Sequence, residues 1–171
     1  MPFTPYHFGP AGFIALLFKK WVDIPVFLLA NVAIDVEVGI IMMFGLGEWR
    51  HRYSHTFIGG ILVGVALAVV AFPMRGIFKK IMSVFRLSYN TNFLKMLIWS
   101  ILGVWFHILI DSFDHWDVRP FWPYSSRNPF FGIISDEHIK MICLVFWVFL
   151  LILLAVNYLR SKRADANLKG T

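Results

Sequence analysis

Long apolar runs separated by short polar stretches dominate the sequence. Four runs, residues 24–46, 55–72, 93–113 and 139–159, are long enough to cross a hydrocarbon layer about 30 Å thick at about 1.5 Å per helical residue. A fifth run, residues 8–18, is too short to span alone and predicts a short helix packed against the next segment. The pattern predicts an all-α integral membrane bundle of four transmembrane helices plus a short N-terminal helix, in a single domain over residues 1–171.

Composition supports this class and excludes several others. Hydrophobic residues make up 58% of the 171-residue chain and charged residues 15%, against about 25% charged in soluble domains. A soluble globule of this length could not bury so much apolar surface, and the mean hydropathy is +0.69. Disorder, collagen and coiled coils are excluded. The single cysteine, Cys143, also excludes intramolecular disulfides and a Cys-rich zinc site.

The net charge of +6 indicates membrane orientation rather than a nucleic-acid partner, because the basic residues lie in loops beside apolar runs. The basic turn after the short helix, the basic stretch between the second and third spans, and the basic tail 160–171 fall on one side if the helices alternate. We predict a multi-pass inner-membrane protein with a cytoplasmic C-terminus. The first ten residues hold no Lys or Arg, so we expect no cleaved signal and a retained His7.

Ionisable side chains are expensive inside a membrane and mark functional candidates. Those within the apolar runs are histidines and carboxylates, the ligands that suit Zn, Mn or Fe. His107, Asp111, Asp114 and His115 form one polar stripe, since helical residues three or four apart share a face. Two ligands one turn apart commonly chelate a metal. The alternative is a hydrogen-bonded polar seam, for which Ser, Thr or Asn would be commoner.

Two further pairs carry the same residue types. His51 and His55 are four apart just before an apolar helix, where a metal site and a wet interfacial loop are equally good interpretations. Asp35 and Glu37 lie inside a span, about 200° apart around a regular helix, so they cannot share a face. Either one is a ligand and the other a supporting or catalytic group, or the helix is locally broken.

Counting residues places these groups at similar depths. His7, Asp35 and His107 each lie twelve residues from the Lys or Asp of a predicted cytoplasmic turn or loop, or about 18 Å. Asp111 comes out at about 24 Å and His55 at about 30 Å, at the outer mouth. A lone histidine such as His7 is seldom a ligand. Four chain segments nevertheless place His or carboxylate groups in the outer half of the bundle, within reach of one metal site.

The loop after the stripe, residues 117–130, is rich in Pro and aromatic residues and predicts a rigid interfacial cap over the site. Three arginines are candidates for binding a phosphate or carboxylate of a substrate: Arg52, Arg119 and Arg127. Anchoring to lipid headgroups is an equally good interpretation of these arginines.

The order of short motifs resembles a known family. The motifs are Pro-Phe-Thr-Pro-x-His ending at His7, the acidic pair Asp35 and Glu37, His-Arg-x-x-His-Thr at residues 51–56, His-x-x-x-Asp at residues 107–111, and a Pro-x-x-Pro loop ending in serines at residues 120–126. Over residues 2–138 they resemble the predicted membrane-bound metal-dependent hydrolases, the group that includes the LexA-regulated inner-membrane hydrolase. The family usually has Asp-x-Asp at the acidic pair, and many members have one more residue before the second histidine. The resemblance implies a hydrolase similar to zinc-dependent phospholipase C.

We therefore predict a divalent-metal site, with zinc as the expected ion and one or two ions bound, that opens to the outer side and activates a water for hydrolysis. The predicted metal-binding residues are His7, Asp35, His51, His55, His107, Asp111 and His115. Glu37 is the first candidate for general base, and Asp114 is a second catalytic candidate. The expected partners are membrane lipid and a lipid or small-molecule substrate, a lipid phosphoester in particular, and no nucleic acid.

Two rival functions use the same residues. A metal-binding transporter or sensor would need polar groups continuing to the cytoplasmic side, and the inner halves of these helices hold almost none. A structural bundle without metal would leave the matched depths of the ligands as coincidence.

Overall fold

The computed structural model describes residues 4–45, 51 and 53–169, and every regular element within these ranges is helical. The α-helices are α1 (Thr4–Leu17), α2 (Ile24–Ala33), α3 (Asp35–Phe44), α4 (Phe57–Ala71), α5 (Arg75–Val84), α6 (Phe93–Asp114) and α7 (Asp136–Lys169). Two 3-10 turns, η1 (Tyr53–His55) and η2 (Phe72–Met74), flank α4. Four segments are long and apolar enough to cross a membrane: Ile24–Phe44, Phe57–Val84, Phe93–Asp114 and Asp136–Ala164. The predicted helical membrane bundle is confirmed.

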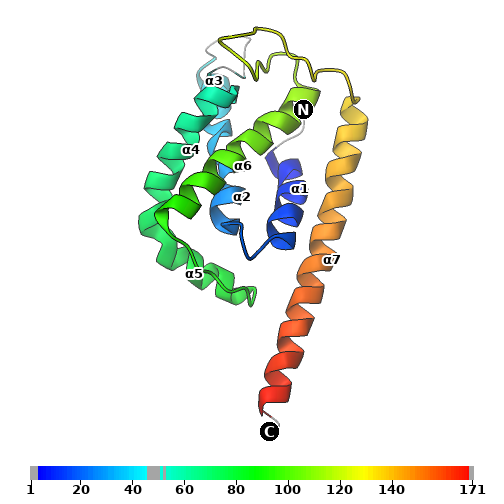
Figure 1. Cartoon of the computed structure of the whole chain (residues 1–171). Helices are drawn as coiled ribbons and strands as arrows, with labels where there is room; N and C mark the ends of the chain where they lie inside the picture. Colours follow the sequence, from blue (N-terminus) through cyan, green and yellow to red (C-terminus); the bar gives the residue numbers. More distant parts are fainter. Residues whose placement is uncertain (1–3, 46–50, 52, 170–171) are drawn as a thin grey trace.

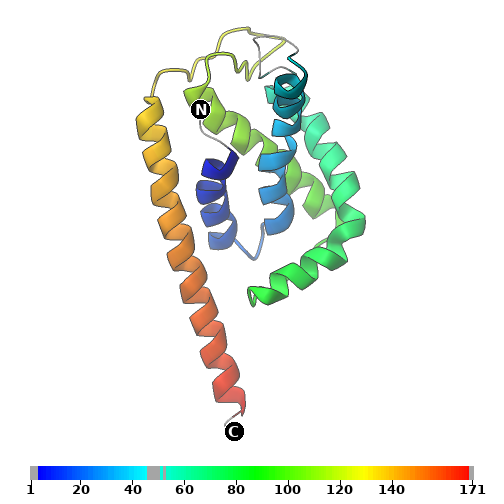
Figure 2. The ribbon, with the colours of Figure 1, turned by 180° about the vertical axis from the view of Figure 1, so that it is seen from behind.

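The helix α6 crosses the bundle obliquely and packs against α2 and α4, while α1 packs between α2 and α7 (Figures 1 and 2). The helix α7 runs beside α1 and extends well beyond the other helices. The start of α1 and the end of α6 share one end of the bundle, called here the upper end as in Figure 1. The α1–α2 turn and the start of α6 share the opposite, lower end.

Small residues allow α6 to approach its neighbours closely. A Cβ atom at Gly64 of α4 would lie 2.8 Å from the Cα of Ile101, and one at Gly103 of α6 would lie 2.8 Å from the carbonyl oxygen of Phe27. Helices in lipid gain little from hydrophobic burial against each other, so close van der Waals packing of this kind holds them together.

Polar side chains cap the N-termini of three helices. The carboxylate of Asp23 accepts from the backbone N–H of Val26 at the start of α2, and the amide oxygen of Asn92 accepts from the N–H of Lys95 at the start of α6. The hydroxyl of Thr56 accepts from the backbone of α4 at 2.8 Å. Each cap satisfies a backbone donor that the helix itself leaves free.

The stretch between the second and third predicted spans is not a simple basic loop. The predicted second span, 55–72, begins at Phe57, and the chain continues through η2 into the helix α5. Phe78 and Met82 of α5 are buried one turn apart, whereas Lys79 and Lys80 are exposed. The charged residues of α5 interrupt the apolar stretch of the sequence. The predicted second span therefore ends before this amphipathic helix.

Three other boundaries also shift. The first predicted span, 24–46, is divided at Ile34 into α2 and α3, and Gly45 ends α3 with a left-handed φ of 60°. The short helix predicted at 8–18 begins at Thr4. The last span begins at Asp136 rather than residue 139, and its helix continues through most of the predicted tail to Lys169. Charged residues at a helix end lower the hydropathy of a window without ending the helix.

Replacing Gly64 by Ala should destabilise the bundle by about 1–3 kcal/mol, because the new methyl group would overlap the backbone of α6. Unfolding in detergent, followed by circular dichroism, measures the change. Gly39→Ala is the matched control, since no atom lies within 4 Å of the added Cβ and the helix gains a better helix former. Equal stability of the two variants would contradict close packing between α4 and α6.

Candidate metal centre

The carboxylate of Asp111, buried in the upper part of α6, is the centre of the site. Five of the six histidines of the chain place Nε2 within 4.0 Å of its oxygens: His107 at 3.0 Å, His7 at 3.2 Å, His51 and His55 at 3.7 Å, and His115 at 4.0 Å. The carboxylate of Asp35 joins them, with Oδ1 3.3 Å from Nε2 of His107 and 3.6 Å from Nε2 of His55. Groups from across the sequence thus converge at one point.

Each element delivers its group for a local reason. The stripe of α6 presents His107 and Asp111 one turn apart, and α6 ends at Asp114 so that His115 follows in extended conformation. The division of the first span at Ile34 makes Asp35 the first residue of α3. The turn η1 brings His55 to Asp111, so the expectation that His55 lies nearer the outer mouth than the other groups is wrong in detail. A residue count assumes upright helices, and α6 is oblique (Figure 1).

The ligand atoms form two compact groups, within each of which they lie within 4.8 Å of one another. The first group is Asp35, His55, His107 and Asp111, and the second is His51, His115 and Asp117. Asp111 contacts histidines of both groups through its two oxygens. The arrangement therefore has room for one ion or for a pair that shares this carboxylate.

Buried polar atoms without partners test whether a cation fits. Nε2 of His55 is buried and has no hydrogen-bond partner within the described part of the chain, and Nε2 of His7 and Oδ1 of Asp111, also buried, have only each other, at 3.2 Å and without hydrogen-bond geometry. An unpaired buried polar atom costs about 1–3 kcal/mol, more if charged. All three atoms belong to the cluster around Asp111, and a divalent cation would satisfy nitrogen and carboxylate lone pairs together. The donor set of imidazoles and carboxylates fits zinc or a similar ion.

His55 and His115, which lie outside the membrane-spanning segments, favour the neutral form. Burial is the largest cause that lowers the pKa of His115 to about 4, and the neighbouring His51 adds to it. Burial also lowers the pKa of His55, with His51 and His107 acting in the same direction. Neutral imidazoles keep a lone pair, which is the form that a metal ion binds.

His7 contacts the cluster through both ring nitrogens. Its Nδ1 lies 2.8 Å from Nδ1 of His107, so one ring donates and the other accepts. If the ring of His7 accepts, His7 carries its proton on Nε2 and has no lone pair there for a metal ion. His107 belongs to a compact ligand group and His7 to neither. The geometry therefore suits His7 as a group that orients His107, and its predicted role as a ligand stays a prediction.

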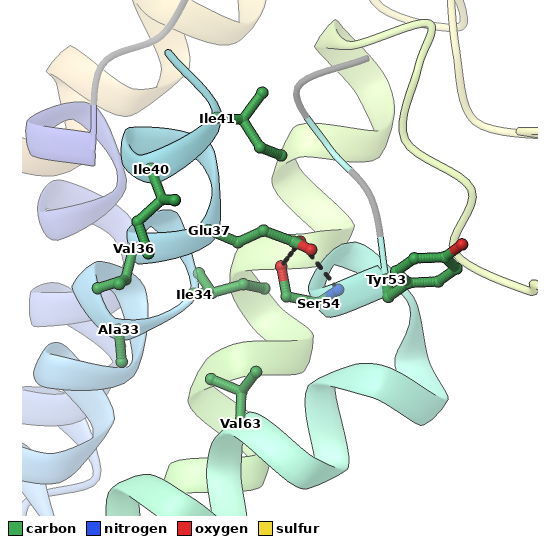
Figure 3. A pocket seen from close by; sticks show the side chains of 9 residues that line it. All are labelled: Ala33, Ile34, Val36, Glu37, Ile40, Ile41, Tyr53, Ser54 and Val63. Carbon is green, nitrogen blue, oxygen red and sulfur yellow. Dashed lines mark hydrogen bonds between the residues drawn. The ribbon is translucent and has the colours of Figure 1, made fainter. Parts of the chain in front are cut away.

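Glu37 stands outside both groups and reaches the cluster through Ser54. Its Oε2 accepts from the backbone N–H of Ser54 at 3.0 Å and also from the Ser54 hydroxyl (Figure 3). The same hydroxyl lies 3.0 Å from Nδ1 of His55. A hydroxyl that donates to Glu37 accepts from Nδ1–H of His55, which leaves Nε2 of His55 free to face the cluster. Of the two alternatives for the acidic pair, the helix break beside Asp35 is observed. The division of tasks between the two acids stays a prediction.

Asp117 was not predicted as a site residue. It is buried, accepts from the backbone N–H of His51 at 3.1 Å, and lies 2.9 Å from Nδ1 of His51. The clue in the sequence was the spacing His115-x-Asp117 directly after the stripe. This signal is weak, because an irregular loop has no periodicity that would place Asp117 beside the stripe. Asp117 orients His51 as Ser54 orients His55.

Asp114, the second predicted catalytic candidate, lies beside the second ligand group. Its Oδ2 lies 3.5 Å from Nε2 of His115, and the carboxylate of Asp136 at the start of α7 is close enough to interact with it. The contact joins α6 to α7 beside the site. Its catalytic role stays a prediction.

The loop after α6 covers the upper end of the bundle, as predicted (Figure 1). The carbonyl oxygen of Pro120 accepts from the N–H of Phe57 at 2.9 Å, and the side chain of Asn128 donates to the carbonyl oxygen of Ser112 at 2.8 Å. These bonds fix the loop to the ends of α4 and α6.

The structure describes two of the three arginines that are predicted to bind a substrate. Arg119 is half-buried in this loop, and Arg127 is exposed. Arg52 lies outside the described residues. Their role toward a substrate stays a prediction.

The family assignment follows from a match over most of the chain. The family model of the YdjM inner membrane protein matches residues 11–167. The chain belongs to this family. It is therefore a multi-pass inner-membrane protein, as the sequence predicted. The chain matches no curated protein and no solved structure.

Replacing Asp111 by Asn should abolish stoichiometric metal binding, because an amide cannot supply the shared negative charge. Elemental analysis of the detergent-purified protein measures the metal content. His138→Ala is the matched control, since His138 is exposed and lies outside both ligand groups. Equal metal content in the two variants would contradict a centre built on Asp111.

Replacing Glu37 by Gln tests its link through Ser54. If Glu37 acts by orienting His55, metal affinity should fall about 10- to 100-fold, as it does when a residue supporting a ligand is lost. Titration with a competing chelator measures the affinity. Unchanged metal affinity together with lost hydrolysis would instead identify Glu37 as the general base.

Proposed function

We propose that this protein is a membrane-embedded metal-dependent hydrolase that acts on a phosphoester of a lipid or lipid-linked substrate. The observation that supports the proposal most strongly is the convergence of five imidazoles on the Asp111 carboxylate, with unpartnered nitrogen and oxygen atoms directed into the cluster. Ionisable groups gathered at such cost inside a membrane protein serve a function by default.

The residues of the site would divide the work. A bound divalent ion supplies positive charge that lowers the pKa of a coordinated water and stabilises charge on the reacting oxygen. Asp35 and Asp111 balance the charge of the ion, and Ser54 and Asp117 fix the ring orientations of His55 and His51. Glu37 would act as general base: its carboxylate would take a proton from the Ser54 hydroxyl as that hydroxyl takes one from the attacking water.

A lipid substrate is supported by the surroundings of Glu37. A pocket of about 460 Å³ lies between α3, η1 and α4, and Figure 3 shows the Glu37 carboxylate directed toward Ser54 among aliphatic side chains. Ile34, Ile40 and Val63 line this pocket, and both helices belong to membrane-spanning segments. An apolar pocket with a few polar groups at one point suits an amphiphile whose chain lies in lipid while its polar part reaches the cluster.

The upper end suits a phosphoryl group. The covering loop carries Arg119 and Arg127. One guanidinium group can bind two oxygens of a phosphate through two parallel hydrogen bonds. We propose that these arginines hold the phosphate near the cluster, on the outer side of the membrane.

The proposal predicts that metal-loaded protein hydrolyses phospholipids or isoprenoid phosphates presented in mixed micelles. Asp111→Asn should lower the rate by more than the about 10- to 100-fold that loss of a supporting residue costs. His138→Ala should leave the rate unchanged. Released phosphate or phosphorylated headgroup is measured directly. Metal-loaded protein that hydrolyses none of these lipids, yet exchanges metal in liposome counterflow, would favour the transporter instead.

A further inference from the structure

A second polar site lies at the lower end of the bundle, opposite the histidines. The α1–α2 turn contributes Lys19 and Lys20, and the first turn of α6 contributes Lys95. These lysines line a pocket of about 70 Å³ together with Val22, Ile24, Met82, Ser88, Tyr89 and Asn90. The lining residues include three lysines, a serine, a tyrosine and an asparagine, and no acidic residue.

The positive charge of this pocket is not neutralised within the described residues. Lys19 donates to the amide oxygen of Asn157 on α7, and Lys95 donates to the carbonyl oxygen of Asn90 at 3.0 Å. Both acceptors are neutral. In the part of the chain that the structure describes, none of the three lysines forms an ion pair within 4.0 Å. Like charges held close together are unfavourable unless an anion joins them.

The nearest carboxylate in the sequence, Asp23, is already engaged. It is fully buried, caps α2, and accepts from the hydroxyls of Tyr89, at 3.1 and 3.2 Å, and of Thr91. Burial and the negative charge of Asp23 raise the pKa of Tyr89, so Tyr89 stays a hydrogen-bond donor. These bonds fix the loop before α6 to the start of α2 and so hold the walls of the pocket.

The neighbouring helix indicates the source of the anion. Met82 of α5 forms one wall of the pocket, and the apolar side chains of Ile77 and Ile81 on the same helix are exposed. Lys79 and Lys80 lie on the same helix between these residues. An amphipathic helix with exposed apolar and basic residues, continuous with a membrane-spanning segment, is typical of a helix that lies in the membrane interface. Acyl chains beside α5 and a phosphate in the pocket belong naturally to one molecule.

The geometry points to a binding site for the phosphate of an anionic phospholipid, formed by Lys19, Lys20 and Lys95 at the lower end of the bundle. The pocket has the volume of about two water molecules, so it admits a phosphate group and not a whole headgroup. Basic pockets between transmembrane helices bind anionic headgroups in this way. The site is independent of the proposed hydrolysis, because the metal centre lies at the other end of the molecule (Figure 1).

Native mass spectrometry of the detergent-purified full-length protein tests the site with phosphatidylglycerol and phosphatidylcholine as probes. Phosphatidylglycerol should bind more tightly than phosphatidylcholine. Each lysine near a membrane surface contributes about fivefold, so Lys20→Gln with Lys95→Gln should weaken phosphatidylglycerol binding about 25-fold. Lys162→Gln with Arg163→Gln, exposed changes of the same total charge on α7, is the matched control and should have no effect. Unchanged melting temperatures in phosphatidylcholine confirm that the variants fold.

Three outcomes would overturn the proposal. Equal weakening by Lys162→Gln with Arg163→Gln would assign the preference to general surface charge. Equal binding of both lipids by the wild-type protein would remove the preference for an anionic headgroup. Stabilisation by inorganic phosphate, lost in the double variant and with no added effect of phosphatidylglycerol, would assign the pocket to a soluble phosphate instead of a lipid.

Discussion

The buried carboxylate of Asp111 is the group around which the upper half of the bundle is organised. A carboxylate in a membrane helix is tolerated only if other polar groups surround it, because the bilayer supplies no water to solvate it. Here α1, α3, η1, α6 and the loop after α6 each contribute a histidine or an aspartate to that shell. The same requirement fixes the register of these elements, since each must bring one side chain to the same point.

This requirement also accounts for the irregular parts of the fold. The helix restarts at Asp35, η1 precedes α4, and α6 ends directly beyond its polar stripe. Each irregularity places a ligand or a residue that orients one, as Ser54 does for His55. Non-helical backbone at membrane depth persists only where it is buried in protein and its polar groups are paired. The regular parts of α4 and α6, by contrast, are held by small residues such as Gly64 and Gly103.

The two ends of the molecule carry different kinds of ionisable residues. Histidines and carboxylates gather at the upper end, and lysines with neutral partners gather at the lower end around a pocket that α5 partly closes. The long α7 contacts both, through Asp136 beside Asp114 and through Asn157 beside Lys19. The fold therefore carries two sites of different chemistry, separated by the length of α6.

The sequence by itself determined the helical membrane class, the number of spans and most of their ends, and most groups of the cluster. These follow from local properties: apolar length, the spacing of His107 and Asp111, and the cost of ionisable groups in lipid. Only the tertiary structure decided that His7 meets His107, that Glu37 is hydrogen-bonded to Ser54, that Asp117 is hydrogen-bonded to His51, and that α5 is a helix beside three lysines. Such contacts join residues distant in sequence, and no periodicity along the chain encodes how oblique helices bring them together.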